Sequence, residues 1–252
     1  GGPGLGTIQP SQGDYFQACK GGGHGDYRLI VLAPASVQEM HDFVALGFDL
    51  AFKYRNPAMI LADGAIGQMM EKVVLAPQRP RKTNEEIAAE CRDWATYGKP
   101  ADRPRNVVTS LELQSEAMEK INLRLQAKYK AMEENEVRYE ALACDDADYV
   151  IVAFGSSARI CSATVEMARA EGIRLGMLRP ITLYPFPTRP IAELAARVKG
   201  FLSVELNAGQ MVEDVRLAVN GAVPVEHYGR QGGMIYSPDE VLAALKEKLI
   251  KA

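Results

Sequence analysis

From residue 147 to residue 252 the chain alternates short apolar runs with amphipathic stretches, and this alternation constrains the fold most strongly. The apolar runs predict four strands, namely Tyr149–Phe154, Ile173–Leu178, Phe201–Leu206 and Val223–Tyr228. The amphipathic stretches predict four helices, namely Ala158–Glu171, Ile191–Val198, Gln210–Asn220 and Pro238–Ile250. Strands that alternate with helices imply parallel β–α–β units, so we predict a compact α/β domain with a parallel sheet over residues 147–252.

The beginning of the chain carries a shorter pattern of the same kind. Leu29–Pro34 is an apolar run that predicts a strand, and Ala58–Ala62 predicts a second one. Between them, Ser36 and Glu39 have the spacing of a capping box, in which each side chain accepts from the backbone amide of the other residue. A helix should therefore begin after Ser36, and residues 1–76 are predicted to contain one β–α–β unit.

The middle of the chain is much richer in charge than the rest. Between Gln78 and Glu140, 24 of 63 residues are charged, against 37 of the other 189. The stretch Gln114–Glu140 contains no Gly or Pro and spaces Met118, Ile121, Leu125 and Met132 along one helical face. We therefore predict that residues 77–146 form a charged linker with a long helix.

Composition excludes several classes of function. The 29 basic and 32 acidic residues give a formal charge of −3, and basic residues do not cluster with aromatic ones, so we expect no nucleic-acid or membrane partner. The apolar runs are also far too short to span a bilayer. The four cysteines are scattered, which excludes a zinc knuckle or an iron–sulfur cluster held by this chain and favours free thiols in the cytoplasm.

Two glycine-rich loops near the start of the chain are candidate binding loops. The run Gly1–Thr7 has neither the Gly-Lys-Ser/Thr ending of a P-loop nor a preceding strand, so by itself it predicts a turn-rich loop rather than a phosphate site. Polar residues then follow at Gln12 and Asp14, and His24 lies among glycines. Long loops of this composition are often binding loops, while a turn histidine held by Asp26 is an equally good interpretation of His24.

Two further turns lie at the carboxyl ends of predicted strands, where open α/β sheets place their ligands. Gly155–Ser157 could bind a phosphate group but lacks the Gly-x-Gly-x-x-Gly pattern, so a tight turn is the better interpretation. In Glu205–Met211, Asn207 could equally be a helix N-cap and Gly209 a turn residue, and His227 is interpreted as structural. No spacing identifies a nucleophile, a base or a pair of carboxylates, so no catalytic residue is assigned.

In their order and spacing, several short motifs together resemble one known family, the α subunits of the 2-oxoacid:ferredoxin oxidoreductases, in the 2-oxoisovalerate (3-methyl-2-oxobutanoate) branch. The resemblance covers almost the whole chain. The motifs that carry it are Gly1–Thr7, Gln12–Asp14, His24–Asp26, Leu32–Pro34, Ser36–Glu39, Gly155–Ser156, Arg179–Thr182, Pro185–Pro187 and Glu205–Met211.

The resemblance implies an enzyme that oxidatively decarboxylates a branched-chain 2-oxoacid to its acyl-CoA and passes the electrons to ferredoxin. It implies a pyrimidine-type thiamine diphosphate domain followed by a transketolase C-terminal-like domain. A partner β subunit would hold the diphosphate and Mg²⁺, while small subunits or fused domains would carry the iron–sulfur clusters and the CoA contacts. The implied partners are the β and γ/δ subunits and ferredoxin. The residues implied at the thiamine and substrate pocket are Gly2, Gly4, Thr7, Gln12, Asp14 and His24.

The family pattern also has a portion before the Gly-Gly-Pro loop, including a glutamate for the aminopyrimidine and an arginine for the substrate carboxylate. We expect residues 1–76 to be only the second half of the pyrimidine-type domain, and the chain to be inactive by itself.

Two other functions stay open at this level. One is a non-catalytic assembly module that docks partners through the charged helix Gln114–Glu140. The other is a nucleotide-binding α/β domain centred on Gly155–Ser157.

Overall fold

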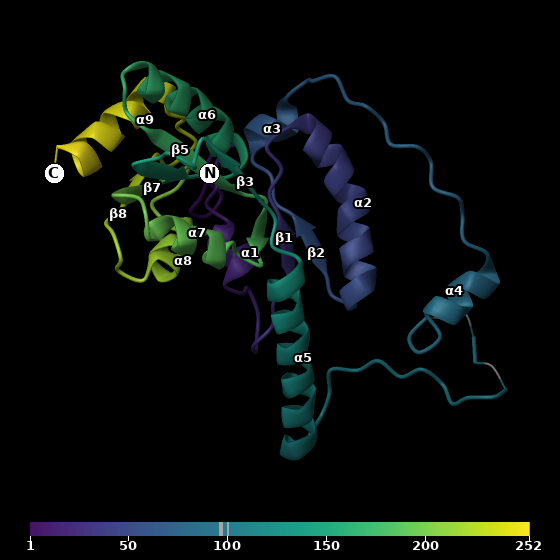
Figure 1. The fold of residues 1–252 in the computed structure, drawn as a ribbon. Coiled ribbons are helices and arrows are strands. Elements are labelled where there is room, and N and C mark those ends of the chain that lie inside the picture. The colour runs from purple at the N-terminus through teal and green to yellow at the C-terminus, as the bar shows by residue number, and fades with distance from the viewer. Residues whose placement is uncertain (96–97, 100, 252) are drawn as a thin grey trace. The chain divides into compact units, whose positions relative to one another are not determined.

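A computed structural model of the chain describes residues 1–95, 98–99 and 101–251, and it contains a sheet of five strands and a sheet of three (Figure 1). Contacts divide the chain into two units, of which one comprises Gly1–Val74 with Lys128–Ala252 and the other comprises Leu75–Ala127. Both sheets belong to the first unit, so the two ends of the chain fold together.

The larger sheet has the strand order β3-β5-β4-β7-β8. Its strands are β3 (Tyr139–Leu142), β4 (Tyr149–Val152), β5 (Leu175–Pro180), β7 (Gly200–Glu205) and β8 (Val225–Gly229). Every pair among β5, β4, β7 and β8 is parallel, which confirms the predicted parallel α/β architecture. Only β3, at the edge beside β5, is antiparallel.

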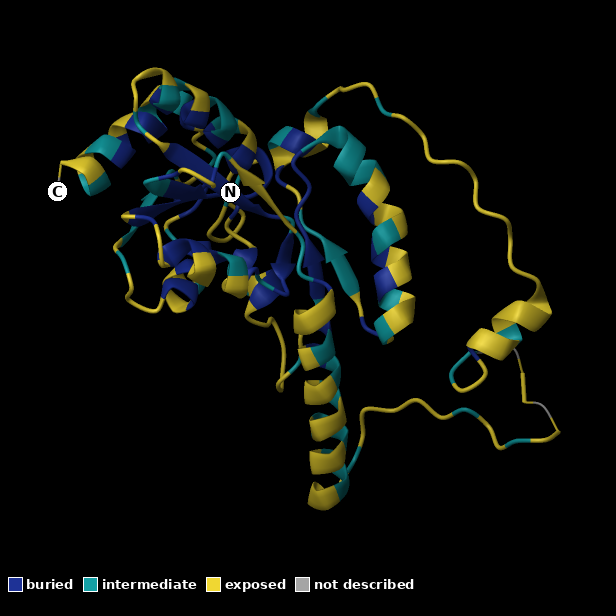
Figure 2. Ribbon diagram, in the orientation of Figure 1, coloured by how far each residue is buried: buried dark blue, intermediate teal, exposed yellow. Residues whose placement is uncertain are grey.

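Helices cover both faces of this sheet, as expected for parallel strands. They are α6 (Gly155–Ala170), α7 (Thr188–Ala195), α8 (Met211–Val219) and α9 (Pro238–Leu245), the last continued by a π-helical turn at Lys246–Ile250. Figure 1 shows α6 and α9 on one face and α7 and α8 on the other. Buried residues concentrate on β4, β5 and β7 (Figure 2). Ile151, Leu175 and Leu202 form one hydrophobic cluster with Val165 and Leu245.

The smaller sheet has the order β2-β1-β6, with β1 at Ile30–Leu32, β2 at Ala58–Ile60 and β6 at Thr182–Tyr184. Strands β1 and β2 are parallel and are joined by α2 (Val37–Tyr54), which confirms the predicted β–α–β unit. Strand β6 pairs antiparallel with β1, so the segment that follows β5 leaves the larger sheet and completes the smaller one. Two short helices lie next to these strands in the chain, α1 (Tyr15–Cys19) before β1 and α3 (Gly64–Gln68) after β2.

The predicted helix over Gln114–Glu140 is too long. The observed α5 spans Ser115–Asn135, and the chain then turns into β3, because the backbone amide of Arg138 donates to Thr182 Oγ1 at 2.9 Å and Tyr139 pairs with Pro180. On α5, Tyr129 and Met132 are buried in the first unit. Within the second unit, α4 (Asn84–Glu90) begins with a capping box between Thr83 and Glu86.

None of the helices in the described ranges has the length and apolar character that crossing a membrane requires.

The capping box at the start of α2 forms only in part. Ser36 Oγ accepts from the backbone amide of Glu39 at 3.1 Å, as predicted, but the Glu39 carboxylate does not reach back to Ser36. It accepts instead from the amide of Ala35 at 2.7 Å and from both terminal nitrogens of Arg179 at 2.8 and 2.6 Å. Since Arg179 is only 4% exposed, this two-point ion pair ties α2 to β5.

We expect Arg179→Met to lower the free energy of unfolding at pH 7 by about 2 kcal/mol, because the mostly buried Glu39 carboxylate loses its partner. Burial by itself raises the pKa of Glu39, but the hydrogen bonds from Arg179 and from the amide of Ala35 outweigh it and lower that pKa. The pair therefore stabilises the fold fully above the unfolded pKa of about 4.3, and its contribution is lost as the pH falls through the folded pKa.

Urea unfolding of both proteins at pH 7 and pH 3.5 measures this, with Arg189→Met as the control. Arg189 and Glu193 form an ion pair whose side chains are 89% and 62% exposed, so its loss should not change the unfolding midpoint. If Arg179→Met lowered the free energy of unfolding by the same amount at both pH values, the loss could not be assigned to the ionised Glu39 carboxylate.

Candidate functional site

The first glycine-rich loop is closed by its own backbone. The amide of Thr7 donates to the carbonyl of Gly1 at 2.8 Å, and Gly6 has a φ of +55°, where an added Cβ would lie 1.8 Å from the same carbonyl oxygen. Thr7 Oγ1 also donates to the carbonyl of Gly232 at 3.1 Å. Gly2 and Gly4 are exposed, so the outer side of the loop is accessible to solvent or to a partner molecule.

Gln12 lies deeper and has a different environment from the rest of the loop. It is 5% exposed, its Nε2 donates to the carbonyl of Phe154 at 2.8 Å, and its Oε1 accepts from Ser157 Oγ at 2.6 Å and from the amide of Leu206 at 3.0 Å. The side chain is thus committed to the ends of β4 and β7. Asp14 and His24, by contrast, are exposed and make no side-chain hydrogen bond within the described ranges.

The turn Gly155–Ser157, at the start of α6, lies at β4, where the strand order of the larger sheet reverses. Side chains of this protein form hydrogen bonds with the turn at the place where a ligand could bind. Asp63 Oδ2 accepts from the amide of Ser156 at 3.2 Å and from Ser156 Oγ at 2.6 Å, and Tyr236 donates to Ser157 Oγ at 2.5 Å.

Gly155 has a φ of +56°, and an added Cβ would lie 3.0 Å from Gln12 Nε2. The cavity beside Gly155 and Asp14 has about 20 Å³, room for about one water molecule. The positive φ of Gly155 supports the tight-turn interpretation, and the Ser156 amide and both serine hydroxyls already have partners within the protein.

The segment Glu205–Met211 is organised around a fully buried carboxylate. Glu205 accepts from Ser203 Oγ and Asn207 Nδ2, each at 3.0 Å, and from the backbone amides of Gln210, Met211 and Val212 at 3.1, 2.7 and 2.9 Å. Those amides form the start of α8, whose N-cap is Gln210 and not Asn207. Gly209 is a turn residue with a φ of +103°.

His227, on β8, lies beside this cluster, with its Nε2 4.0 Å from Glu205 Oε1. Burial lowers the pKa of His227. Its packing against Gly209 and Gly229 supports the structural interpretation.

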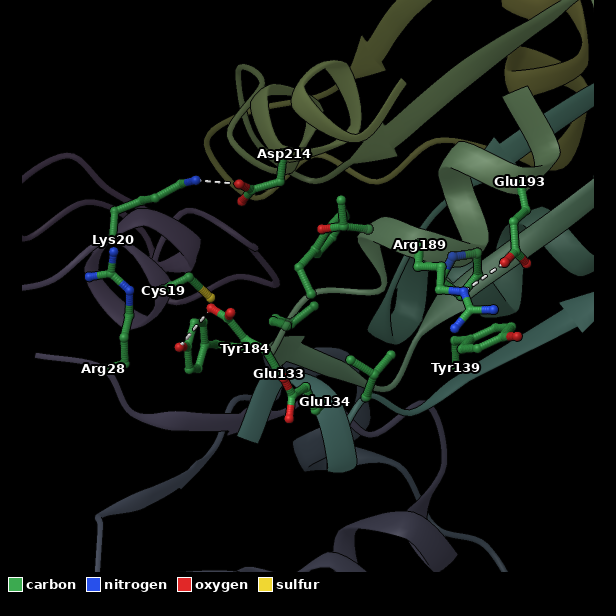
Figure 3. A pocket seen from close by; sticks show the side chains of 15 residues that line it. Cys19, Lys20, Arg28, Glu133, Glu134, Tyr139, Tyr184, Arg189, Glu193 and Asp214 are labelled. Carbon is green, nitrogen blue, oxygen red and sulfur yellow. Dashed lines mark hydrogen bonds and ion pairs between the residues drawn. The ribbon is translucent and has the colours of Figure 1, made fainter. Parts of the chain in front are cut away.

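A cavity of about 810 Å³ lies elsewhere in the first unit, between α1, the end of α5, β6 and α7 (Figure 3). Its charged side chains are mostly paired. Lys20 binds Asp214 at one end, Arg189 binds Glu193 at the other, and Tyr184 donates to Glu133 at 3.2 Å. None of the six residues assigned to the thiamine pocket lines this cavity. The sequence gives no signal for it, because its walls come from segments far apart in the chain.

Metal ligands do not gather in the described ranges, where no group of three His, Cys, Asp or Glu side chains could hold an ion. All four cysteines are buried free thiols.

Comparison with known proteins places the whole chain in one group. Residues 1–140 match the family model for the thiamine diphosphate-binding domain of pyruvate flavodoxin/ferredoxin oxidoreductases, and residues 147–241 match core domain II of pyruvate:ferredoxin oxidoreductase. The ketoisovalerate oxidoreductase subunit VorB of Methanothermobacter thermautotrophicus is 49% identical over 248 residues, which cover 98% of this chain and 68% of that protein. The 2-oxoglutarate synthase subunit KorA of Methanothermobacter marburgensis is 36% identical, over 94% of this chain and 68% of that protein.

Among solved structures, a 2-oxoglutarate:ferredoxin oxidoreductase from Magnetococcus marinus, with 2-oxoglutarate, coenzyme A and succinyl-CoA bound, matches with a TM-score of 0.79. The match covers 99% of this chain and 47% of that one at 21% identity, so it supports the fold.

Proposed function

The chain belongs to the 2-oxoacid:ferredoxin oxidoreductases, in the ketoisovalerate branch, and we propose that it forms one wall of a thiamine diphosphate site that a partner subunit completes. It is a subunit of an enzyme that oxidatively decarboxylates a 2-oxoacid to its acyl-CoA with ferredoxin as electron acceptor. The observation that carries the proposal is the 49% identity with a ketoisovalerate oxidoreductase subunit over nearly the whole chain. On the same ground we propose 3-methyl-2-oxobutanoate as the preferred substrate.

The described residues suit one side of such a site. Gly2, Gly4, Asp14 and His24 are exposed on loops, and the two polar side chains among them have no hydrogen-bond partner within the described ranges. Mg²⁺ prefers oxygen ligands, and the described ranges contain no group of three His, Cys, Asp or Glu side chains that could hold a metal ion. On the family resemblance, we place the diphosphate and its Mg²⁺ on a partner subunit.

This chain's own contribution is then to shape the pocket and to orient the cofactor and the substrate in it. When bound, thiamine diphosphate supplies the electron sink that decarboxylation of a 2-oxoacid requires. Gly2, Gly4 and Thr7 would let the loop approach the cofactor and substrate closely, while Asp14 and His24 would supply polar contacts. Gln12, whose side chain is occupied by the protein, would hold the loop in place.

Other parts of the enzyme belong to the same proposal. We place the iron–sulfur clusters and the CoA contacts on partner subunits or fused domains. We place the enzyme in the cytoplasm, where the four free thiols of this chain stay reduced. The division into residues 1–76, 77–146 and 147–252 stays a prediction.

The test is reconstitution of this chain with its partner subunits, thiamine diphosphate, Mg²⁺, CoA and ferredoxin. We expect acyl-CoA formation that depends on thiamine diphosphate, with kcat/KM at least about tenfold higher for 3-methyl-2-oxobutanoate than for 2-oxoglutarate, since pocket shape discriminates side chains by such factors. This chain alone should form no acyl-CoA.

Three outcomes would contradict parts of this proposal. A preference for 2-oxoglutarate would overturn the substrate assignment. Turnover by the chain alone would overturn the shared site. A stable complex without any thiamine diphosphate-dependent turnover would favour the non-catalytic assembly module.

A further inference from the structure

Two motifs about 195 residues apart in the sequence meet in the fold. Asn207 Nδ2 donates to the backbone carbonyl of Gln12 at 2.9 Å, and Gln210 Nε2 donates to the backbone carbonyl of Gly13 at 2.8 Å. The backbone amide of Gln12 also donates to the carbonyl of Leu206 at 3.0 Å. The segment after β7 therefore holds the backbone of the Gln12-Gly13-Asp14 motif.

The same glutamine also holds the helix that follows this motif. Gln210 Oε1 accepts from the backbone amide of Phe16 at 2.9 Å, in the first turn of α1. Its amide group thus bridges residues 13 and 16, one on each side of Asp14. One turn further along α8, Asp214 accepts from the Tyr15 hydroxyl at 2.5 Å and pairs with Lys20.

Asn207 and Gln210 are themselves fixed by their neighbours. Asn207 Nδ2 also donates to the buried carboxylate of Glu205, and Asn207 Oδ1 accepts from the amide of Gly209 at 2.7 Å. The backbone amide of Gln210 donates to the same carboxylate. Because these hydrogen bonds already fix Asn207 and the backbone of Gln210, little conformational freedom is lost when the two side chains bind the loop.

From these contacts we infer that Asn207 and Gln210 are positioning residues, which hold Asp14 and the segment Gln12–Phe16 in the geometry that the cofactor and substrate require. The transketolase C-terminal-like domain, from which both side chains come, then supports the segment Gln12–Phe16 on the proposed thiamine side of the chain. This inference rests on the proposed function for its catalytic consequence, although the anchoring itself does not.

Gln210 is the better residue to change, because it is only partly buried, whereas Asn207 lies against Glu205. Gln210→Met removes both hydrogen bonds to the loop. Gln210→Glu keeps an oxygen that can accept from Phe16 and loses the donor to Gly13. Gln17→Met is the matched control. Gln17 lies exposed on α1, next to Phe16, and makes no side-chain hydrogen bond within the described ranges.

The first readout is amide hydrogen exchange of residues 12–17 in the assembled enzyme, which does not depend on activity. We expect exchange at least about tenfold faster in Gln210→Met, with Phe16 affected less in Gln210→Glu, and no change in Gln17→Met. The second readout is steady-state kinetics. We expect kcat to fall by about 10- to 100-fold in Gln210→Met at an unchanged urea midpoint, because a small misplacement of a positioned group costs rates of that order.

Each outcome decides a different part of the inference. Unchanged exchange in Gln210→Met would overturn the anchoring. Faster exchange with normal kcat and KM would overturn the positioning role, while the family's reaction would stand. If the wild-type assembly shows no turnover at all, the proposed function fails, and the exchange experiment still tests the anchoring.

Discussion

Replacing Glu205 by glutamine is expected to lower the free energy of unfolding by about 3 kcal/mol, although the two side chains have nearly the same shape. The carboxylate is fully buried and accepts five hydrogen bonds, three of them from the first backbone amides of α8. A glutamine NH₂ group cannot accept, so whichever oxygen it replaces, at least one backbone amide of α8 is left without a partner in the interior.

The measurement is urea unfolding followed by far-ultraviolet circular dichroism, with Glu213→Gln as the control. Glu213 lies in the first turn of the same helix but is exposed, so both variants lose one negative charge at the start of α8. We expect the midpoint of Glu213→Gln to stay close to that of wild type. Equal midpoints for the two variants would show that helix-end charge, rather than buried hydrogen bonding, accounts for the role of Glu205.

A second large loss, also of about 3 kcal/mol, is expected for Gly229→Ala, at the end of β8. An added Cβ would lie 2.3 Å from the backbone carbonyl oxygen of Asn207 and 2.8 Å from that of Glu205. Backbone atoms cannot move aside as the tip of a side chain can, so either the β7–β8 pairing opens or the Asn207 turn shifts.

Gly67→Ala is the matched control for this substitution. Gly67 lies in α3 with open space around its Cβ position, so alanine should leave stability unchanged or raise it slightly. The same urea experiment compares the two variants. A midpoint for Gly229→Ala as high as that for Gly67→Ala would mean that the close approach of β8 to the turn after β7 is not required.

Both substitutions also bear on the loop near the start of the chain, because Glu205 and Gly229 shape the turn that carries Asn207 and Gln210. Partial destabilisation there should appear as faster exchange at residues 12–17 before the larger sheet unfolds. The stability of α8 and the order of the loop are thus connected through one buried carboxylate.

The sequence alone was sufficient for most of the strands, for the main helices of the larger sheet and for the family. Strands β1, β2, β4, β5, β7 and β8 lie where apolar runs predict them, and α9 begins at Ser237 with the capping box that its residues predict. These features depend on residues within a few positions of one another, which periodicity and capping patterns report directly. The order and spacing of short motifs identified the family, whereas the placement of Gly2, Gly4, Thr7, Asp14 and His24 at a cofactor stays a prediction.

Only the tertiary structure decided what several of those motifs do within the chain. Strands β3 and β6 have four and three residues, and their pairing depends on partners about 40 and 150 residues away, which no local pattern contains. Glu39 binds Arg179 rather than the amide of Ser36, and Glu205, five residues before the N-cap, replaces a local cap for α8.

Gln12 shows the physical reason most clearly. In the sequence it is a polar residue next to a glycine-rich loop of the kind that usually lies on the surface. Its side-chain amide could equally well bind a ligand or form hydrogen bonds within the protein. Folding places the ends of β4 and β7 beside it. The hydrogen bonds of its buried side chain are then made with the carbonyl of Phe154, the amide of Leu206 and the hydroxyl of Ser157. Local sequence determines which conformation a segment prefers, whereas the partner of a polar side chain depends on which distant groups the packed sheets bring within 3 Å.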